Sequence, residues 1–212
     1  MSEYFVDEMS SLLDEGKSIT HKALCTKIDA KIDDAKFFTK LPRLPQDFDA
    51  QQIDWAYGPV VQSGGKYDLR LTAVPDEEEL RPGIIIAGFG IRYKTYSAII
   101  SRTYLVDPTK SQESNYALLL NIYDAVIKEI RDGVVAKDLY NKAIGIVRAK
   151  RPELEKHFLK NIGAGIGIEL RDGNMVLNGK NTRTLKSGMT LYISIGLSDV
   201  QEQGQDDRKD ST

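Results

Sequence analysis

A glycine-rich stretch is the first part of this sequence whose residue types suggest chemistry. Residues 161–172 read NIGAGIGIELRD, with glycine at every second position from Gly163 to Gly167. A glycine-rich loop can bind phosphate through its backbone amides when a helix follows it. Here the spacing is G-x-G-x-G, no Gly-Lys-Ser/Thr ending follows, and the next residues are typical of a strand. The pattern therefore favours a strand that another backbone approaches closely over a nucleotide site.

Metal-dependent hydrolysis would need several carboxylates and imidazoles close together, and the sequence offers few of them. Its two histidines are His21 and His157, each in or just after a predicted helix and without a second histidine at ligand spacing. We interpret both as ordinary surface or helix-end residues. Acidic residues are absent from 83–106 and from 187–198, which are strand-like runs. We therefore expect no metal centre on these strands and no cofactor.

Nucleophilic catalysis needs a serine or cysteine beside a base. Four serines lie on strand-like runs without a nucleophile elbow: Ser97, Ser101, Ser194 and Ser198. Their base would have to be one of the same two histidines. Glu169 and Asp172 lie beside the glycine run, where a carboxylate pair stays open as an alternative to the solvated strand end that we favour. The single cysteine, Cys25, fits a small buried hydrophobic residue in a reducing compartment.

The charge of the chain argues against a dedicated nucleic-acid or membrane-surface binder, because 29 Lys and Arg nearly cancel 31 Asp and Glu. One compact acidic cluster, PDEEEL, occupies residues 75–80. Its acidic members are Asp76, Glu77, Glu78 and Glu79. The cluster fits either a contact patch for a basic partner or solvated acids of a loop or helix start. Arg148, Lys150 and Arg151 mark the C-terminus of a predicted helix, where cations suit the helix dipole.

The length of 212 residues and the hydrophobic fraction of 41% favour one compact domain. We expect this domain to span 1–200. Residues 201–212 contain no apolar residue and are predicted to form a disordered tail or a truncated loop. No run approaches the about 20 apolar residues that cross a bilayer, and the first residues lack a signal-peptide pattern. We expect a soluble intracellular protein.

Hydrophobic periodicity predicts two helices and then strands in the first half of the chain. The apolar residues of the first helix are Phe5, Met9, Leu12 and Leu13. Gly16 can end this helix in the left-handed conformation, and Ser18 or Thr20 can cap the next one. The buried stripe of the second helix is predicted to be Ala23, Leu24, Ile28 and Ile32. Residues 36–56 read as irregular, while 56–63, 83–93 and 96–106 read as strands. Lys94 and Thr95 join the last two strands in a hairpin.

The second half repeats this order. A long helix is predicted from about Ser111 to before Gly133, and another over 136–152. The apolar residues of the long helix are Tyr116, Leu119, Tyr123, Val126, Ile127 and Ile130. Strands follow at 159–170, 174–177 and 189–197, with turn signals at 172–173, 178–179 and 187–188. The sequence thus predicts an α+β fold of two similar halves, in which helices back a curved, mostly antiparallel sheet.

Together these stretches resemble the pita-bread fold of the methionine aminopeptidase and creatinase family, over almost the whole chain. Metal-dependent members carry two aspartates on the first strand pair, and the matching positions hold Gly88 and Ile99. The histidine of the family's G-H-G-I-G pattern is replaced by Ala164, and the glutamate of its G-M-x-x-x-I-E-P-G pattern by Ser194. The resemblance implies a peptidase-like domain whose metal-ligand positions are vacated and which is catalytically inactive.

More narrowly, the stretches YFVDEMSSLLDEGKSITH, VVQSGGKYDLRL, FGIRYKTYSAIISRTYLVDPT and GIGIELRDGNMVLNGKN resemble the peptidase-like domain found in large subunits of FACT histone chaperones. This resemblance implies a nuclear, chromatin-associated protein that binds core histones. It also implies a role in reorganising nucleosomes during transcription, replication and repair. A smaller FACT subunit would be bound through domains outside this sequence, and neither a membrane nor a specific nucleic-acid sequence is an expected partner.

The favoured hypothesis is a non-catalytic module that holds histone segments by its acidic rim and its former substrate groove. Candidate groove residues are Gln62, Lys66, Tyr67, Arg70 and Arg171. The alternative interpretation is that these residues only support loops. A second hypothesis is a metal-free pita-bread hydrolase acting on a small amide or peptide. It needs an imidazole in the pocket, where the matching region offers Leu71. A third is a nucleic-acid-associated relative, which would show salt-dependent affinity for RNA or DNA.

Overall fold

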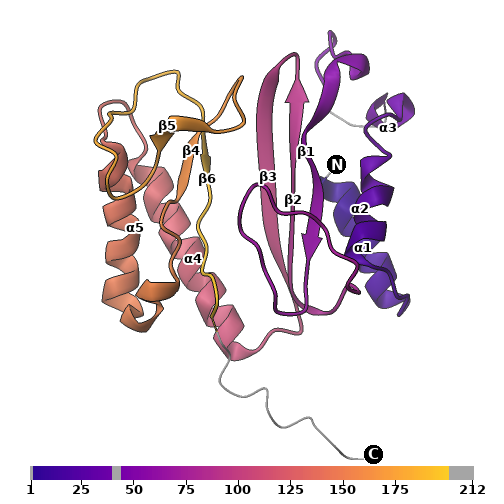
Figure 1. Cartoon of the computed structure of the whole chain (residues 1–212), viewed down its shortest axis with the longest axis horizontal. Coiled ribbons are helices and arrows are strands. Elements are labelled where there is room, and N and C mark those ends of the chain that lie inside the picture. Colours follow the sequence, from indigo (N-terminus) through magenta and orange to yellow (C-terminus); the bar gives the residue numbers. More distant parts are fainter. Residues whose placement is uncertain (1, 40–43, 201–212) are drawn as a thin grey trace, which may run out of the picture. The chain divides into compact units, whose positions relative to one another are not determined.

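Helices come first in each half of the chain and strands follow them, as the sequence predicts (Figure 1). The computed structural model describes residues 2–39 and 44–200, so the predicted tail at 201–212 lies outside the described residues. The chain divides into two compact units. One comprises Met1–Pro108 with Ile166–Asp172, and the other comprises Thr109–Gly165 with Gly173–Thr212.

The first helix, α1 (Ser2–Asp14), buries Phe5 and Met9 and ends as predicted. Gly16 adopts a left-handed φ of 62°, which glycine tolerates without a steric penalty. The amide of Gly16 donates to the Leu13 carbonyl at 3.2 Å, and the amide of Lys17 donates to the Leu12 carbonyl at 3.0 Å. This pair of bonds satisfies carbonyls that the last turn of a helix would otherwise leave unpaired.

The second helix, α2 (His21–Asp29), begins at Thr20, whose hydroxyl accepts a hydrogen bond from the Ala23 amide. Ser18 is therefore not the cap. The predicted burial of Leu24, Ile28 and Ile32 is confirmed, although Ile32 lies beyond the helix end, and that of Ala23 is wrong because Ala23 is exposed. The buried residues are His21, Leu24, Cys25 and Ile28. His21 lies at a helix end, as one of its two interpretations had it, but the other, a surface residue, is wrong because its side chain is 1% exposed.

Three antiparallel strands follow in the order β1-β2-β3. They are β1 (Ile53–Gln62), β2 (Gly83–Tyr93) and β3 (Tyr96–Val106), so β2 and β3 keep their predicted bounds and β1 starts earlier than predicted. Two short helices precede them, α3 (Ala35–Thr39) and η1 (Ala50–Gln52). Lys94 and Thr95 both have positive φ, at 46° and 75°. Such a two-residue turn matches the twist of the strands that it joins.

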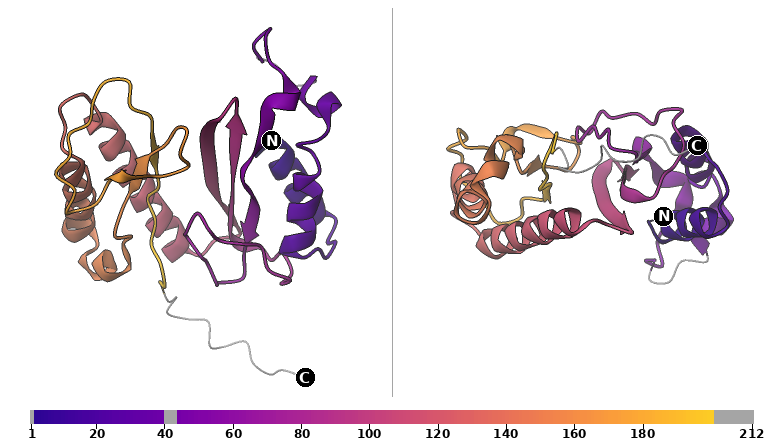
Figure 2. Two further views of the ribbon diagram at one scale, coloured as in Figure 1. Left: turned by 45° about the horizontal axis from the view of Figure 1, so that its top comes forward. Right: turned by 90° about the horizontal axis from the view of Figure 1, so that it is seen from below.

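Helices α1 and α2 pack on one side of this sheet (Figure 2). Leu24 and Ile28 of α2 are fully buried, as are Val61 of β1 and Ile85 of β2. Burying an aliphatic side chain of this size contributes about 1.5–3 kcal/mol. This cluster fixes the N-terminus of α2 against the sheet, which matters for the polar site described below.

The second unit has its own core beneath two helices, α4 (Lys110–Glu129) and α5 (Ala136–Lys150). A capping box of Thr109 and Gln112 starts α4, and a short helix, η2 (Pro152–His157), follows α5. Arg148 and Lys150 lie in the last turn of α5, as predicted. The helices of this unit provide most of its buried apolar residues. Among the described residues, no helix is both long and apolar enough to cross a membrane.

The apolar residues noted for the long helix lie only in part on the buried face of α4. The buried residues are Leu118, Ile122 and Val126, whereas Tyr123 and Ile127 are 41% and 42% exposed. Apolar residues occupy two neighbouring faces of this helix, and periodicity alone cannot decide which of them meets α5.

Three short strands complete the second unit in the order β5-β4-β6. They are β4 (Gly163–Gly165), β5 (Asp172–Val176) and β6 (Leu191–Ile193). Strands β4 and β6 are shorter than predicted, whereas β5 begins two residues earlier than predicted and ends one residue earlier. The turn expected at Asp172 and Gly173 is wrong, because both residues belong to β5.

Candidate functional site

Gly163 forms the close backbone contact that the glycine run predicts. It has a φ of 137°, and a Cβ built on it would lie 2.0 Å from the Tyr192 carbonyl oxygen. Strands β4 and β6 pair here, with Gly163 opposite Ile193. A Cβ on Gly167 would meet nothing nearer than the Tyr96 ring at 3.7 Å. The need for glycine is therefore strict at Gly163 and is not evident at Gly167.

At the position predicted to lack the first aspartate, a side chain would collide with Ser101. Gly88 is buried on β2 opposite Ser101 of β3. A Cβ on Gly88 would lie 2.5 Å from Ser101 Oγ and 3.3 Å from the Ile100 carbonyl oxygen. Ile99, at the second predicted position, pairs with Gly90 and is half-buried. An aspartate at residue 88 would require Ser101 to move.

The other two predicted positions also lack a metal-binding group. Ala164 is fully buried in β4, and Ser194 is exposed just after β6. The Ser194 amide donates to the Ile162 carbonyl at 3.0 Å. Within residues 2–39 and 44–200, no group of three or more His, Cys, Asp or Glu side chains could hold a metal ion. The residues present thus do not fit the metal centre that an active peptidase of this fold would need.

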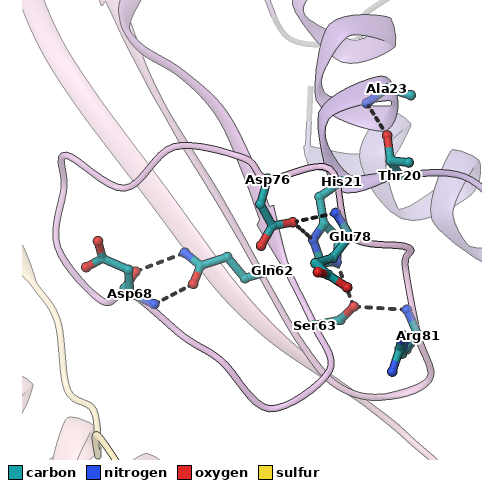
Figure 3. A network of polar contacts seen from close by, with 9 residues as sticks. All are labelled: Thr20, His21, Ala23, Gln62, Ser63, Asp68, Asp76, Glu78 and Arg81. Atoms are coloured by element: carbon teal, nitrogen blue, oxygen red, sulfur yellow. Dashed lines mark hydrogen bonds and ion pairs between the residues drawn. The ribbon is translucent and has the colours of Figure 1, made fainter.

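The most organised polar cluster joins α2 to the loop between β1 and β2 (Figure 3). His21 Nδ1 lies 2.5 Å from Asp76 Oδ1, and Nε2 lies 2.7 Å from Ser63 Oγ. Ser63 Oγ also accepts from the Arg81 amide at 2.9 Å. A carboxylate only accepts, so Nδ1 carries a proton, and in the tautomer with Nε2 unprotonated Ser63 donates its hydroxyl hydrogen to Nε2. Every polar atom of the imidazole is then satisfied.

Sequence reasoning missed this cluster, which has the Ser-His-Asp order of a hydrolase triad. Ser63 is 42 residues from His21, and Asp76 is 55 residues from it, so no local spacing reveals the contact. Ser63 is only 7% exposed. Its hydroxyl is already engaged by the Arg81 amide and the imidazole. The cluster therefore acts as a buried clamp that holds both ends of the loop.

The acidic cluster at 75–80 caps the start of α2. The first two amides of the helix, those of His21 and Lys22, donate to the carbonyls of Glu78 and Asp76, each at 2.9 Å. Such amides have no partner within a helix. Glu77 pairs with Lys22 at 2.5 Å, and Glu79 accepts from Ser18 at 2.6 Å. All four acidic residues are exposed, but three of the side chains already bind residues around the α2 N-terminus.

Contact with His21 perturbs the ionisation of Asp76. The hydrogen bond from the imidazole lowers the pKa of the carboxyl below its ordinary value, and the Glu78 amide acts in the same direction. Cys25 behaves differently, because burial raises the pKa of its thiol to about 12. It is therefore a packing residue, as predicted, and not a nucleophile.

Two of the five predicted groove residues brace the same loop. Gln62 donates to the Asp68 carbonyl at 2.9 Å and accepts from the Asp68 amide at 2.5 Å (Figure 3). The Tyr67 hydroxyl donates to the Ile84 carbonyl at 2.8 Å. Arg70 is exposed and ion-paired with Asp68 at 2.6 Å. These contacts give at least Gln62 and Tyr67 a loop-supporting role.

The remaining candidates are dispersed. Lys66 and Arg171 are exposed, and so is Glu169, just before β5. His157, at the end of η2, donates from Nδ1 to the Ser198 carbonyl at 2.9 Å. In the described part of the chain, none of the four serines predicted on strands has a side-chain hydrogen bond to a histidine.

The chain matches the model of metallopeptidase family M24 over residues 2–208. Among curated proteins, it is 76% identical over 209 residues to the FACT complex subunit spt16 of Emericella nidulans, which covers 99% of this chain and 20% of that protein. It is 39% identical over 213 residues to the FACT complex subunit SPT16 of Dictyostelium discoideum, covering 100% of this chain and 19% of that protein. The chain thus spans about a fifth of the length of these relatives.

Solved structures show the same fold. The N-terminal domain of FACT complex subunit SPT16 from Eremothecium gossypii has a TM-score of 0.90 and 37% identity, and the match covers 96% of this chain and 48% of that one. A dipeptidase from Pyrococcus horikoshii has a TM-score of 0.69 and 23% identity, covering 92% and 50%. At this lower identity, the dipeptidase supports the fold alone.

Proposed function

The chain belongs to metallopeptidase family M24, and from this membership we propose that it is the peptidase-like domain of a FACT subunit that binds core histones and does not cleave peptides. The observation that carries the proposal is the 76% identity to a FACT complex subunit along 99% of the chain. We assign the domain to residues 1–200 and its place of action to nuclear chromatin. In the longer relatives, other domains would bind the smaller FACT subunit.

The local structure supports a module without catalysis. Ser101 fills the space beside Gly88, Ala164 is sealed in β4, and Ser194 offers no carboxylate. A buried set of carboxylates without a cation would repel one another, so a domain that has lost its metal is more stable with small or apolar residues there. Family membership then describes ancestry and fold rather than chemistry.

The mechanism that we propose is competitive shielding. A histone segment held by main-chain hydrogen bonds and by acidic side chains cannot hold DNA at the same time. Lys66, Arg70 and Arg171 remain candidates for polar contacts in the former groove, since all three are exposed. Such shielding would let nucleosomes be taken apart and rebuilt during transcription, replication and repair.

A pull-down with purified histone pairs tests this function. The chain would be immobilised and incubated with each pair, with and without its tails, at two salt concentrations. We expect retention of at least one pair, weakened by salt because exposed charges are screened. Absence of retention at both salt concentrations would overturn the proposal. Retention that depends wholly on the tails would place the contact on extended segments rather than on the histone core.

A second candidate is hydrolysis of a small amide or peptide without metal, which the contact of His21 with Ser63 and Asp76 favours. The test is labelling with a fluorophosphonate, a reagent that reacts with activated serines. Labelling of wild type that disappears in Ser63→Ala would support this candidate. We expect none, because Ser63 is buried and its hydroxyl is already hydrogen-bonded.

A further inference from the structure

Strand β3 presents an open edge. One side of β3 pairs with β2 along its whole length, and on the other side Ser97 donates its amide to the Gly167 carbonyl at 2.7 Å. In an antiparallel strand, every second residue directs both backbone groups to the same side. The outward residues after Ser97 are therefore Ile99, Ser101, Thr103 and Leu105. Among the described residues, no strand pairs with these outward groups.

A pocket lies beside this edge, between β3 and the start of α1. It has a volume of about 340 Å³ and is lined by Ser2, Glu3, Val6, Asp7, Ile100, Arg102 and Tyr104. Ile100, Arg102 and Tyr104 occupy alternate positions of β3, so their side chains lie on one face of the sheet. This is the face that α1 covers, because Phe5 of α1 contacts Tyr104. The rings of Phe5 and Tyr104 lie 5.8 Å apart and hold α1 against the strand. A further strand on this edge would direct every second side chain into the pocket.

The pocket lining carries more negative than positive charge. Glu3 and Asp7 are exposed, lie one helical turn apart on α1, and have no ion pair with any described residue. By contrast, Glu8 on the same helix is paired with Lys27. The cation in the pocket lining is Arg102, whose Nη1 donates to the Ser101 carbonyl at 2.8 Å. Arg102 therefore binds an outward backbone group of the edge rather than either carboxylate.

We propose that an extended basic peptide adds a strand along β3 from Ile99 to Leu105 and places alternate lysines or arginines beside Glu3 and Asp7. The outward backbone groups supply the pairing, and the pocket selects the side chains. Val6 and Ile100 accept the aliphatic stems of these residues while their charged ends reach the carboxylates. Arg102 releases the Ser101 carbonyl when the peptide binds. This inference rests on the proposed function, since it identifies the bound segment as a basic histone tail.

The test uses fluorescence anisotropy with a labelled peptide in which lysine alternates with threonine. For Glu3→Gln combined with Asp7→Asn we expect about tenfold weaker binding, because two partly exposed charge pairs are lost. The matched control, Asp14→Asn, removes an exposed acid further along α1 and should leave binding unchanged. Arg102→Ala should bind more tightly, because it removes a like charge and frees the Ser101 carbonyl. Equal affinity of wild type and the double variant would overturn the proposal.

The backbone part of the proposal is tested on the peptide itself. One version of the peptide carries N-methyl groups on its odd-numbered residues, and the other carries them on its even-numbered residues. If the peptide pairs with β3, one version should lose binding and the other should keep it, since only one set of amides faces the strand. Equal binding of both versions would exclude strand addition. The histone pull-down separates the two claims: retention of histones by Glu3→Gln/Asp7→Asn at wild-type level refutes the pocket and leaves the proposed function standing.

Discussion

His21 Nδ1 lies 2.5 Å from Asp76 Oδ1, although 55 residues separate the two along the chain. The contact attaches the loop before β2 to the first turn of α2. His21 also reaches Ser63 at the other end of the loop. One buried ring thus fixes a segment whose exposed residues include Lys66, Arg70 and the acidic cluster.

Replacing His21 tests whether this clamp stabilises the first unit. His21→Ala should lower the free energy of unfolding by about 2–4 kcal/mol, because it leaves a cavity and removes the partners of Ser63 and Asp76. Urea denaturation followed by circular dichroism measures the change. Lys22→Ala, which removes an exposed ion pair in the same turn, is the control and should change the midpoint little. Equal effects of the two variants would show that the clamp contributes nothing.

The lowered pKa of Asp76 predicts how stability depends on pH. Its folded pKa lies below the ordinary value of 3.8, so the carboxylate stabilises the fold fully above that value. The contribution is lost as the pH falls through the folded pKa. Acid unfolding of wild type should therefore be steeper than that of Asp76→Asn below about pH 4. Glu8 and Asp68 also have lowered pKa values but are present in both proteins, so the comparison isolates Asp76. Identical pH dependence of the two proteins below about pH 4 would contradict a stabilising role for the Asp76 carboxylate.

Gly163→Ala should be among the most damaging small substitutions in the second unit. The added Cβ would lie 2.0 Å from the Tyr192 carbonyl oxygen, and φ is 137°. We expect a loss of about 3 kcal/mol or more in the free energy of unfolding, from the steric clash and the backbone strain together. Gly173→Ala is the matched control, since its Cβ would meet nothing within 4 Å. A thermal melt of both variants decides the question, and equal melting temperatures would count against the strand crossing.

Crowding between Gly88 and Ser101 predicts that substitutions at the two positions are coupled. Gly88→Ala should cost about 1–3 kcal/mol through overpacking against Ser101 Oγ. In a Ser101→Ala background the same substitution should cost about 1 kcal/mol less, because the nearest clashing atom is gone. Urea unfolding of wild type, both single variants and the double variant gives this double-mutant cycle. Strictly additive effects would mean that Ser101 does not fill the space beside Gly88.

Local signals explain which parts of the fold were predictable. Gly16 ends α1, and Lys94 with Thr95 turns the β2–β3 hairpin, because each requires only neighbouring residues. The buried face of α4 was not predictable, since Tyr123 and Ile127 are as apolar as the residues that meet α5. Asp172 and Gly173 resemble a turn in sequence, yet both belong to β5, which lies beside β4 in the sheet.

The candidate site divides in the same way. The close approach at Gly163 followed from glycine in a strand-like run, and the packing role of Cys25 followed from its being the single cysteine of the chain. The role of His21 could not be predicted from the sequence, because tertiary packing brings Ser63 and Asp76 to it. Local spacing likewise could not reveal the open edge of β3, which depends on the order of strands in the sheet.

The most direct test of the central claim is calorimetric titration of this chain with manganese or cobalt and, separately, with each histone pair. We predict saturable heat with a histone pair, no saturable heat with either metal, and no hydrolysis of a peptide substrate in the metal-loaded samples. Stoichiometric metal binding accompanied by peptide turnover would contradict the account.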